Sequence, residues 1–155
     1  MPSQKNDAAA TADTKPSGLA YIVGRLDHVL NKRLREGLAP LGMTVPHYTA
    51  LSVFRVMGTL SNAQLAERTM MSPQSANEMV KAMEAKGWIE RAPDPDHGRI
   101  IRIGLTAEGS ACLQRCDAVV REVEALIFPD ISEEERTWLH QQLRSAVRAL
   151  SLHGI

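Results

Sequence analysis

The sequence predicts a mainly α-helical fold that carries one small β-hairpin. Apolar residues recur every three or four positions over most of the 155-residue chain, which is the spacing of an amphipathic helix. Between residues 101 and 105 the pattern changes to alternation, which is typical of a half-buried strand. Aromatic residues make up only 4% of the chain, so we expect an aliphatic core.

The first helix is expected from about residue 18 to residue 39, where apolar residues form one stripe. These residues are Leu19, Ile22, Val23, Leu26, Leu30, Leu34 and Leu38. Pro40 and Gly42 end this helix. Thr44 is the expected N-cap of a second helix, which has Pro46 in its first turn and ends at Gly58.

Two short helices follow in close succession. Ser61 and Gln64 have the spacing of a capping box, which opens the first of them. After a brief link over residues 69–71, Ser72 caps the second, and Pro73 takes the first helical position, where its missing N–H is not needed. This helix has a buried face of Ala76, Met79, Val80 and Met83, and Gly87 closes it.

The hairpin is expected from strands at residues 88–92 and 101–105, joined by a turn-rich loop over residues 93–98. Thr106 then caps a long helix that Pro129 breaks. Ser132 and Glu135 form another capping box, which opens a last helix. Two capped helices with a tight link, followed by a hairpin, predict a winged helix-turn-helix.

A winged helix-turn-helix reads DNA with the start of its second helix and with its wing. The helix enters the major groove, where Gln and Asn side chains pair with adenine, and a wing cation enters the minor groove. The predicted DNA-binding residues are Ser61, Ser72, Pro73, Gln74, Ser75, Asn77, Glu78, Lys81, His97 and Arg99. Each polar residue alone is also typical of a solvated helix face, so the prediction depends on their placement together.

Charge gives no separate support for DNA binding. Residues 61–106 carry six basic and six acidic side chains, whereas residues 1–60 carry seven and four, and residues 107–155 carry five and eight. Any basic footprint must therefore come from where the charges lie. The neutral segment leaves open an alternative, a winged helix that contacts another protein and no DNA.

The chain resembles the MarR (multiple antibiotic resistance regulator) family over residues 19–150. The resemblance rests on the spacing of several blocks taken together. They are Leu60-Ser61-Asn62-Ala63-Gln64-Leu65-Ala66, Ser72-Pro73-Gln74-Ser75, Met83-Glu84-Ala85-Lys86-Gly87-Trp88-Ile89-Glu90-Arg91, Asp94-Pro95-Asp96-His97-Gly98-Arg99 and Leu105-Thr106-Ala107-Glu108-Gly109. It implies a homodimeric regulator, usually a repressor, that binds a palindromic operator and is released by a small aromatic or phenolic ligand.

The sequence departs from the family at two places. His97 replaces the Asp that often steadies the wing arginine, here Arg99. On the recognition helix, Glu78 stands where the family frequently has Arg, and Lys81 stands where an acid is common. A Glu78–Lys81 pair at three-residue spacing would reduce the repulsion between Glu78 and phosphates.

Leftover apolar surface predicts that two chains associate. The first helix and the last two carry stripes longer than one small winged-helix core covers, and reading a palindrome needs two copies. The predicted dimerisation residues are Leu19, Ile22, Leu26, Leu139, Leu143, Val147 and Leu150. The alternative is that these helices pack within one chain. The expected domains are a disordered tail at 1–16, a dimerisation region at 17–43 and 107–155, and a DNA-binding domain at 44–106.

The resemblance places the effector between the dimerisation helices and the winged helix. Arg25, His28 and Lys32 share one stripe of the first helix, and His47 and Tyr48 begin the second. Together they are candidates to bind a carboxylate or phenolate. The alternative, which single residues of these types favour, is a solvated basic face beside a packed tyrosine. Cys112 and Cys116 are candidates for a thiol-based redox switch or for small core residues.

The sequence gives little support for a membrane protein, a secreted protein or an enzyme. No apolar run approaches the roughly 18 residues that span a membrane, and residues 1–16 lack the apolar segment of a signal peptide, so we expect a cytoplasmic protein. No nucleophile–base pair, phosphate loop or carboxylate dyad occurs in a motif context. We therefore expect no enzyme activity, no cofactor and no metal site.

Overall fold

The computed structural model describes residues 18–152, so the predicted disordered tail at 1–16 lies outside the described residues. Helix α1 spans Leu19–Leu38 and continues into a 3-10 turn, η1, at Ala39–Leu41. Helix α2 spans Val45–Met57. The Thr44 hydroxyl caps α2 by accepting from the His47 N–H at 3.3 Å, as the sequence predicts.

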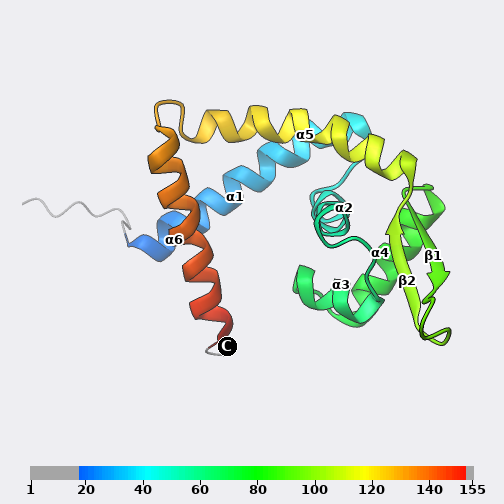
Figure 1. Cartoon of the computed structure of the whole chain (residues 1–155). Coiled ribbons are helices and arrows are strands. Elements are labelled where there is room, and N and C mark those ends of the chain that lie inside the picture. The colour runs from blue at the N-terminus through cyan, green and yellow to red at the C-terminus, as the bar shows by residue number, and fades with distance from the viewer. Residues whose placement is uncertain (1–17, 153–155) are drawn as a thin grey trace, which may run out of the picture.

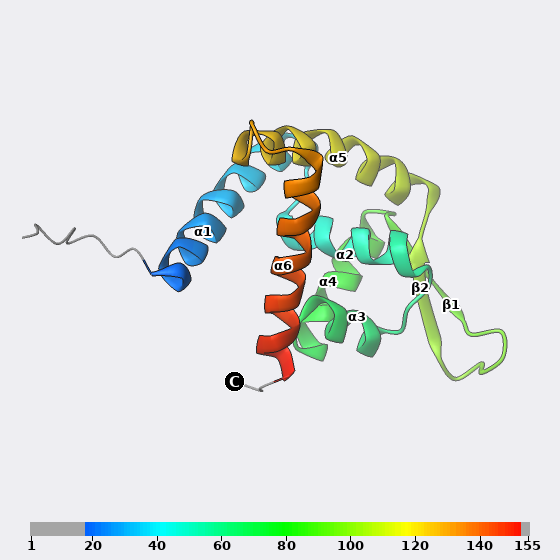
Figure 2. The ribbon, with the colours of Figure 1, turned by 60° about the vertical axis from the view of Figure 1, so that its left-hand side comes forward.

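The two short helices are α3 at Asn62–Thr69 and α4 at Pro73–Ala85. Strands β1 at Ile89–Pro93 and β2 at Ile101–Leu105 form an antiparallel hairpin in which Ile89 pairs with Leu105. A bridge between Leu60 and Ile103 attaches the start of α3 to this hairpin. Figure 2 shows the hairpin loop extending beyond the helices.

Two further helices complete the chain, α5 at Ala107–Ile127 and α6 at Glu133–Leu152. Helices α2, α3 and α4 and the β1–β2 hairpin form what we call the winged half of the molecule. Figure 1 shows that α5 crosses α1, and that α6 turns back from the far end of α5 and lies apart from the winged half. None of the described helices is long and apolar enough to cross a membrane.

The core lies within the winged half and the adjacent ends of α1 and α5. Its largest fully buried side chains are Phe54, Leu38, Leu51, Leu65, Met83, Ile103, Leu113, Val80 and Cys116. Gly109 allows a close approach at this point, because a Cβ there would lie 1.9 Å from the Trp88 carbonyl oxygen. The first turn of α5 is thus held directly against the short link between the end of α4 and the beginning of β1.

Candidate nucleic-acid interface

The start of α4 is held by its own cap. The Ser72 hydroxyl accepts from the Ser75 N–H at 3.1 Å and donates to the Ser75 hydroxyl at 2.9 Å. Pro73 occupies the first helical position. These bonds fix the first turn, in which the remaining free N–H groups and the positive end of the helix dipole are available to an anion such as a phosphate.

Opposite its buried face, α4 presents polar side chains. Ala76, Val80 and Met83 are buried, while Gln74, Ser75, Glu78 and Lys81 are exposed and Asn77 is half-buried. Gln74 Nε2 donates to Glu78 Oε1 at 3.4 Å. The suggested Glu78–Lys81 pair is absent from the ion pairs of the described residues, so the neighbour that engages Glu78 is Gln74.

Helix α3 is joined to the start of α4 by one amide. Asn62 Nδ2 donates to the Pro73 carbonyl oxygen at 3.1 Å. The capping box at Ser61 is formed in both directions, since Ser61 N–H also donates to Gln64 Oε1 at 2.9 Å. Met70 adopts a left-handed conformation with φ of 55° at the turn between the two helices. The turn thus sets α4 against α3 without a glycine.

The wing has an acidic anchor that sequence reasoning missed. Asp94, only 7% exposed, accepts from the N–H groups of Asp96 and His97 at 2.9 and 3.0 Å and from Arg102 Nε at 2.6 Å. The Arg102 hydrogen bond, followed by the two backbone donors, holds the pKa of the Asp94 carboxyl below its usual range. The signal was the Asp-Pro-Asp turn sequence, because Asp side chains often bond backbone N–H groups two or three residues on.

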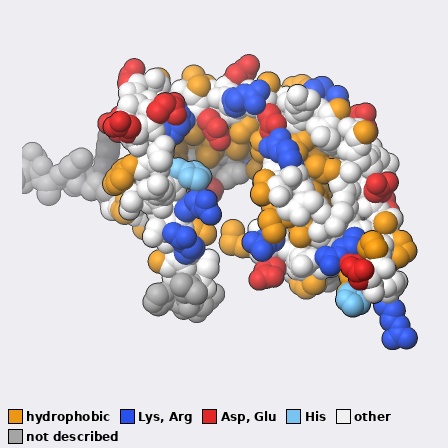
Figure 3. Space-filling view, in the orientation of Figure 1, with side chains coloured by type: hydrophobic (Ala, Val, Ile, Leu, Met, Phe, Trp, Pro, Cys, Tyr) orange, Lys and Arg blue, Asp and Glu red, His pale blue; other side chains and the backbone are white. Residues whose placement is uncertain are grey.

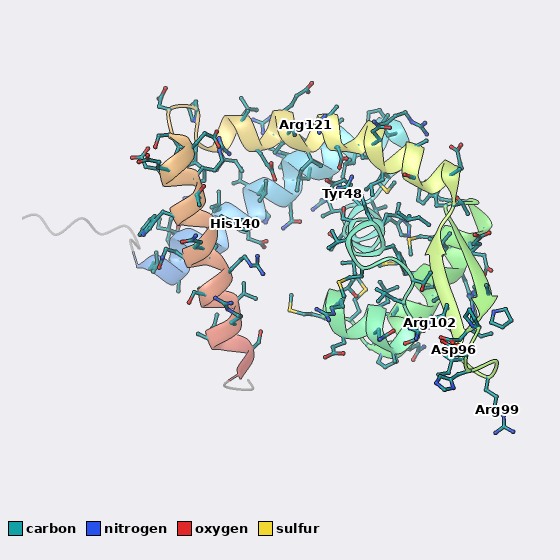
Figure 4. All side chains as sticks on the ribbon, in the orientation of Figure 1. Tyr48, Asp96, Arg99, Arg102, Arg121 and His140 are labelled. Atoms are coloured by element: carbon teal, nitrogen blue, oxygen red, sulfur yellow. The ribbon has the colours of Figure 1, made fainter. Side chains whose placement is uncertain are left out.

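Arg99 lies at the tip of the wing and points away from the rest of the molecule (Figure 4). It is exposed, and so is His97. Although His97 contributes a backbone N–H to the Asp94 anchor, its side chain forms no hydrogen bond within the described residues. The structure thus brings the α4 face, Ser61 and the wing to one half of the molecule, with Arg99 as the outermost cation.

The five predicted effector residues fall into two groups. Arg25, His28 and Lys32 are exposed on α1, and Lys32 lies 3.9 Å from Glu36. His47 and Tyr48 are half-buried on α2. Among the described residues, no hydrogen bond, ion pair or ring contact joins the two groups directly.

His47 and Tyr48 have partners of their own. His47 stacks edge-on against Trp88, with ring centroids 5.9 Å apart, and burial followed by the nearby Lys86 charge lowers its pKa. Tyr48 donates to Asp117 Oδ1 on α5 at 2.9 Å. Burial, reinforced by this carboxylate, raises the pKa of Tyr48.

Asp117 connects the winged half to α5. Besides Tyr48 it accepts two bonds from Arg55 of α2, one of them from Nη2 at 3.3 Å. Burial opposes its ionisation, but the bonds from Arg55 and Tyr48 outweigh burial and lower the pKa of Asp117. Neither Arg55 nor Asp117 was predicted, because 62 residues separate them and no local pattern marks the pair.

The cysteines lie in the core. Cys112 and Cys116 are free and buried. Burial, together with the neighbouring Cys112, raises the pKa of Cys116 to about 11. A thiol with such a pKa stays protonated at neutral pH, whereas redox-sensing cysteines are exposed and have a lowered pKa. Residues 18–152 contain no cluster of three or more metal-ligating side chains.

The predicted dimerisation residues are mostly exposed. Leu19 is 81% exposed and Val147 56%, and Ile22, Leu26, Leu143 and Leu150 are exposed as well. Leu139 is half-buried in a hollow of about 480 Å³ at the α5–α6 turn, beside Phe128 and Trp138. Figure 3 shows hydrophobic side chains gathered in the hollow between α6 and the winged half. Such contiguous apolar surface is typical of an interface.

Known proteins match both the sequence and the fold. A sequence model described as the MarR family matches residues 41–100. The HTH-type transcriptional repressor Rv2887 of Mycobacterium tuberculosis is 31% identical over 81% of this chain and 88% of its own. The multiple antibiotic resistance protein MarR of Escherichia coli is 28% identical over 81% of this chain and 90% of its own.

Two solved structures of Rv2887 are also similar to this chain in fold. Its complex with DNA has a TM-score of 0.69 and 27% identity, covering 84% of this chain and 98% of that one. Its complex with salicylic acid has a TM-score of 0.67 and 28% identity, covering 85% of this chain and 98% of that one.

Proposed function

Because the chain belongs to the MarR family of transcriptional regulators, we propose that it is a repressor that binds double-stranded DNA sequence-specifically. The observation that carries this is the exposed polar face of α4 together with Arg99, which points outward from the tip of the wing (Figure 4). In this arrangement Gln74 and Asn77 read base edges in the major groove, and Arg99 enters the minor groove. Contacts to phosphates, which set the position of the protein on the duplex, come from Ser61, Ser72, Ser75 and Lys81. Pro73 shapes the first turn of α4 at the DNA, and His97 lies beside the minor groove.

The proposed regulator is a homodimer on a palindromic operator. Residues 44–106 form the DNA-binding domain, and residues 17–43 and 107–155 form the dimerisation region. The exposed apolar residues of α1 and α6 support the pairing. Two copies place two recognition helices about one helical turn apart on the duplex, roughly 10 base pairs centre to centre. We place this activity in the cytoplasm, with the DNA.

The proposed effector is a small aromatic carboxylate or phenol. The relative Rv2887 has been solved in complex with salicylic acid. In this chain Arg25, His28 and Lys32 of α1 offer positive charge, and His47 and Tyr48 offer a ring and a hydroxyl. Because each group has contacts of its own and none to the other within the described residues, we propose that α1 of one protomer supplies the cations and α2 of its partner supplies the ring.

Fluorescence anisotropy on the duplex upstream of the protein's own gene tests the DNA-binding proposal. We expect tight binding to that duplex and at least 100-fold weaker binding to a scrambled duplex at the same salt concentration, because specific sites are typically ~10³–10⁷ tighter. Salicylate is expected to release the protein from the upstream duplex. Equal binding to both duplexes would contradict sequence-specific recognition. No binding at all would favour the protein-contact alternative.

A further inference from the structure

A continuous chain of hydrogen bonds connects the wing to the start of α3. Arg102 of β2 lies at its centre: Nε donates to Asp94 Oδ2 at 2.6 Å, and Nη1 donates to Gln64 Oε1 at 3.1 Å. That same Gln64 oxygen accepts the Ser61 N–H at 2.9 Å and so closes the capping box of α3. One guanidinium therefore joins the wing loop to the helix-turn-helix.

The bonds on the wing side enclose the segment that carries Arg99. The Asp94 carboxylate binds the N–H groups of Asp96 and His97. The Asp94 N–H donates to the Ile100 carbonyl oxygen at 2.7 Å, and Ile100 N–H donates to the His97 carbonyl oxygen at 2.8 Å. Arg99 thus lies between two fixed backbone points, and Asp94 is where that loop is tied to Arg102.

Arg102 and Arg99 differ in whether a carboxylate neutralises their charge. Asp94 is the buried charged side chain of the described core, and it faces Arg102, whose side chain is 31% exposed. Two acceptors therefore occupy Arg102, and one of them neutralises its charge. Arg99 has no partner within the described residues and points outward beyond Asp96 and Arg102 (Figure 4). Of these two cations, Arg99 is therefore the one whose charge is not paired within the described residues.

We propose that Arg102 is a positioning residue for DNA recognition, which holds the wing against α3 so that Arg99 meets the minor groove while α4 occupies the major groove. This rests on the proposed function. It also explains how the wing is steadied when His97 replaces the family's aspartate. A planar guanidinium suits the task, because its fork bonds two acceptors at fixed angles, which the single ammonium of lysine does not.

The first test uses the free protein and measures amide hydrogen exchange in the wing. Arg102→Met is expected to speed exchange at the N–H groups of Asp96 and His97, since their acceptor Asp94 loses its tie. Arg91→Met is the matched control. Arg91 lies on the same hairpin, its side chain is 32% exposed, and its Nε lies 2.9 Å from Glu84 rather than from the loop anchor. Unchanged wing exchange in Arg102→Met would overturn the proposal.

The second test is a double-mutant cycle on the upstream duplex. Arg99→Ala and Arg102→Met are each expected to weaken binding about tenfold, which is the lower end of a lost specific contact. If Arg102 acts through Arg99, adding Arg102→Met to Arg99→Ala costs less than about twofold more, because coupled residues are not additive. Arg91→Met is expected to have the same small effect in both backgrounds.

Arg102→Lys separates positioning from a direct phosphate contact. Lysine keeps the charge but loses the fork, so we expect it to weaken binding as methionine does. Full rescue by lysine, or equal losses from Arg102→Met with and without Arg99, would overturn the proposal. If the wild type binds no duplex, the proposed function itself fails. Wild-type binding with an additive cycle removes only the role of Arg102.

Discussion

At position 78 a carboxylate lies on the face of α4 that we assign to DNA, where the family frequently has arginine. Glu78→Gln is expected to tighten binding to a random duplex by about threefold at low salt, the size of one screened charge pair in water. The advantage should fade as salt rises, because phosphate interactions are screened. Anisotropy titrations on random and upstream duplexes at two salt concentrations measure the effect.

The opposite pattern would assign Glu78 to base reading. If its carboxylate accepts from cytosine N4, Glu78→Gln weakens binding to the upstream duplex and leaves random-duplex binding unchanged. The bond from Gln74 to Glu78 favours neither outcome by itself, but it fixes which end of the Gln74 amide faces the carboxylate. A carboxylate only accepts, so the Gln74 oxygen stays free for another donor.

His47 predicts how stability changes with pH. Its pKa in the folded protein is lowered from 6.5, chiefly by burial and then by Lys86, so the unfolded chain binds this proton more tightly. The resulting stability is present above about pH 6.5 and is lost as the pH falls below it. Urea unfolding at pH 7.5, 6.5 and 5.5 is expected to show a smaller loss in His47→Gln than in the wild type.

His140→Gln is the control for this experiment. His140 is exposed on α6 (Figure 4), so His140→Gln also removes one imidazole but leaves His47 and its contact with Trp88 in place. The same slope in His47→Gln and the wild type would show that burial of the imidazole does not oppose its protonation.

Among the elements, α5 depends on one glycine at its start. Adding a Cβ at Gly109 brings it against the backbone of Trp88, which cannot move as a flexible side chain does. Gly109→Ala is expected to destabilise the fold by about 2–3 kcal/mol, the upper range for overpacking. For a chain of this size that lowers Tm by roughly 5–10 °C.

Gly24→Ala provides the comparison, since nothing lies within 4 Å of a Cβ built there. On α1 this change should be neutral or stabilising, because alanine favours helix more than glycine does. Calorimetry on both variants separates the two effects. Equal melting temperatures for Gly109→Ala and the wild type would contradict the close approach of α5 to Trp88.

The elements that sequence predicted correctly are held by local bonds. Ser61, Ser72, Thr106 and Ser132 each bond the N–H three residues on, as the spacing of residue types indicates. The contacts that sequence missed cross between elements. Asp94 and Arg102 meet only once the hairpin register is set, and Tyr48 reaches Asp117 across 69 positions. Neither pairing leaves a periodic signal, because long-range contacts depend on packing.

At the scale of the whole molecule, the apolar surface of α1 and α6 predicts the oligomeric state. Leu19 and Ile22 on α1, and Leu143, Val147 and Leu150 on α6, are left uncovered by the rest of residues 18–152. Covering such surfaces stabilises association by roughly 25 cal/mol per Å² before the costs of ordering. Light scattering at micromolar concentration is therefore expected to give twice the 17.0 kDa chain mass.

Leu143→Glu tests whether dimerisation and DNA binding are one property. A charge on the apolar face of α6 is expected to break the dimer, so that light scattering gives the single-chain mass. Binding to the upstream duplex is expected to weaken by at least about 100-fold, because a monomer contacts only one half-site. Gln141→Glu adds the same charge to an exposed position of the same helix. It faces the polar side beside Arg144 and Arg148, so both mass and affinity should stay near the wild-type values. A monomeric wild type would contradict the dimer outright. A monomeric Leu143→Glu that kept full affinity would show that one chain suffices for binding, and the palindromic operator would then have no structural basis.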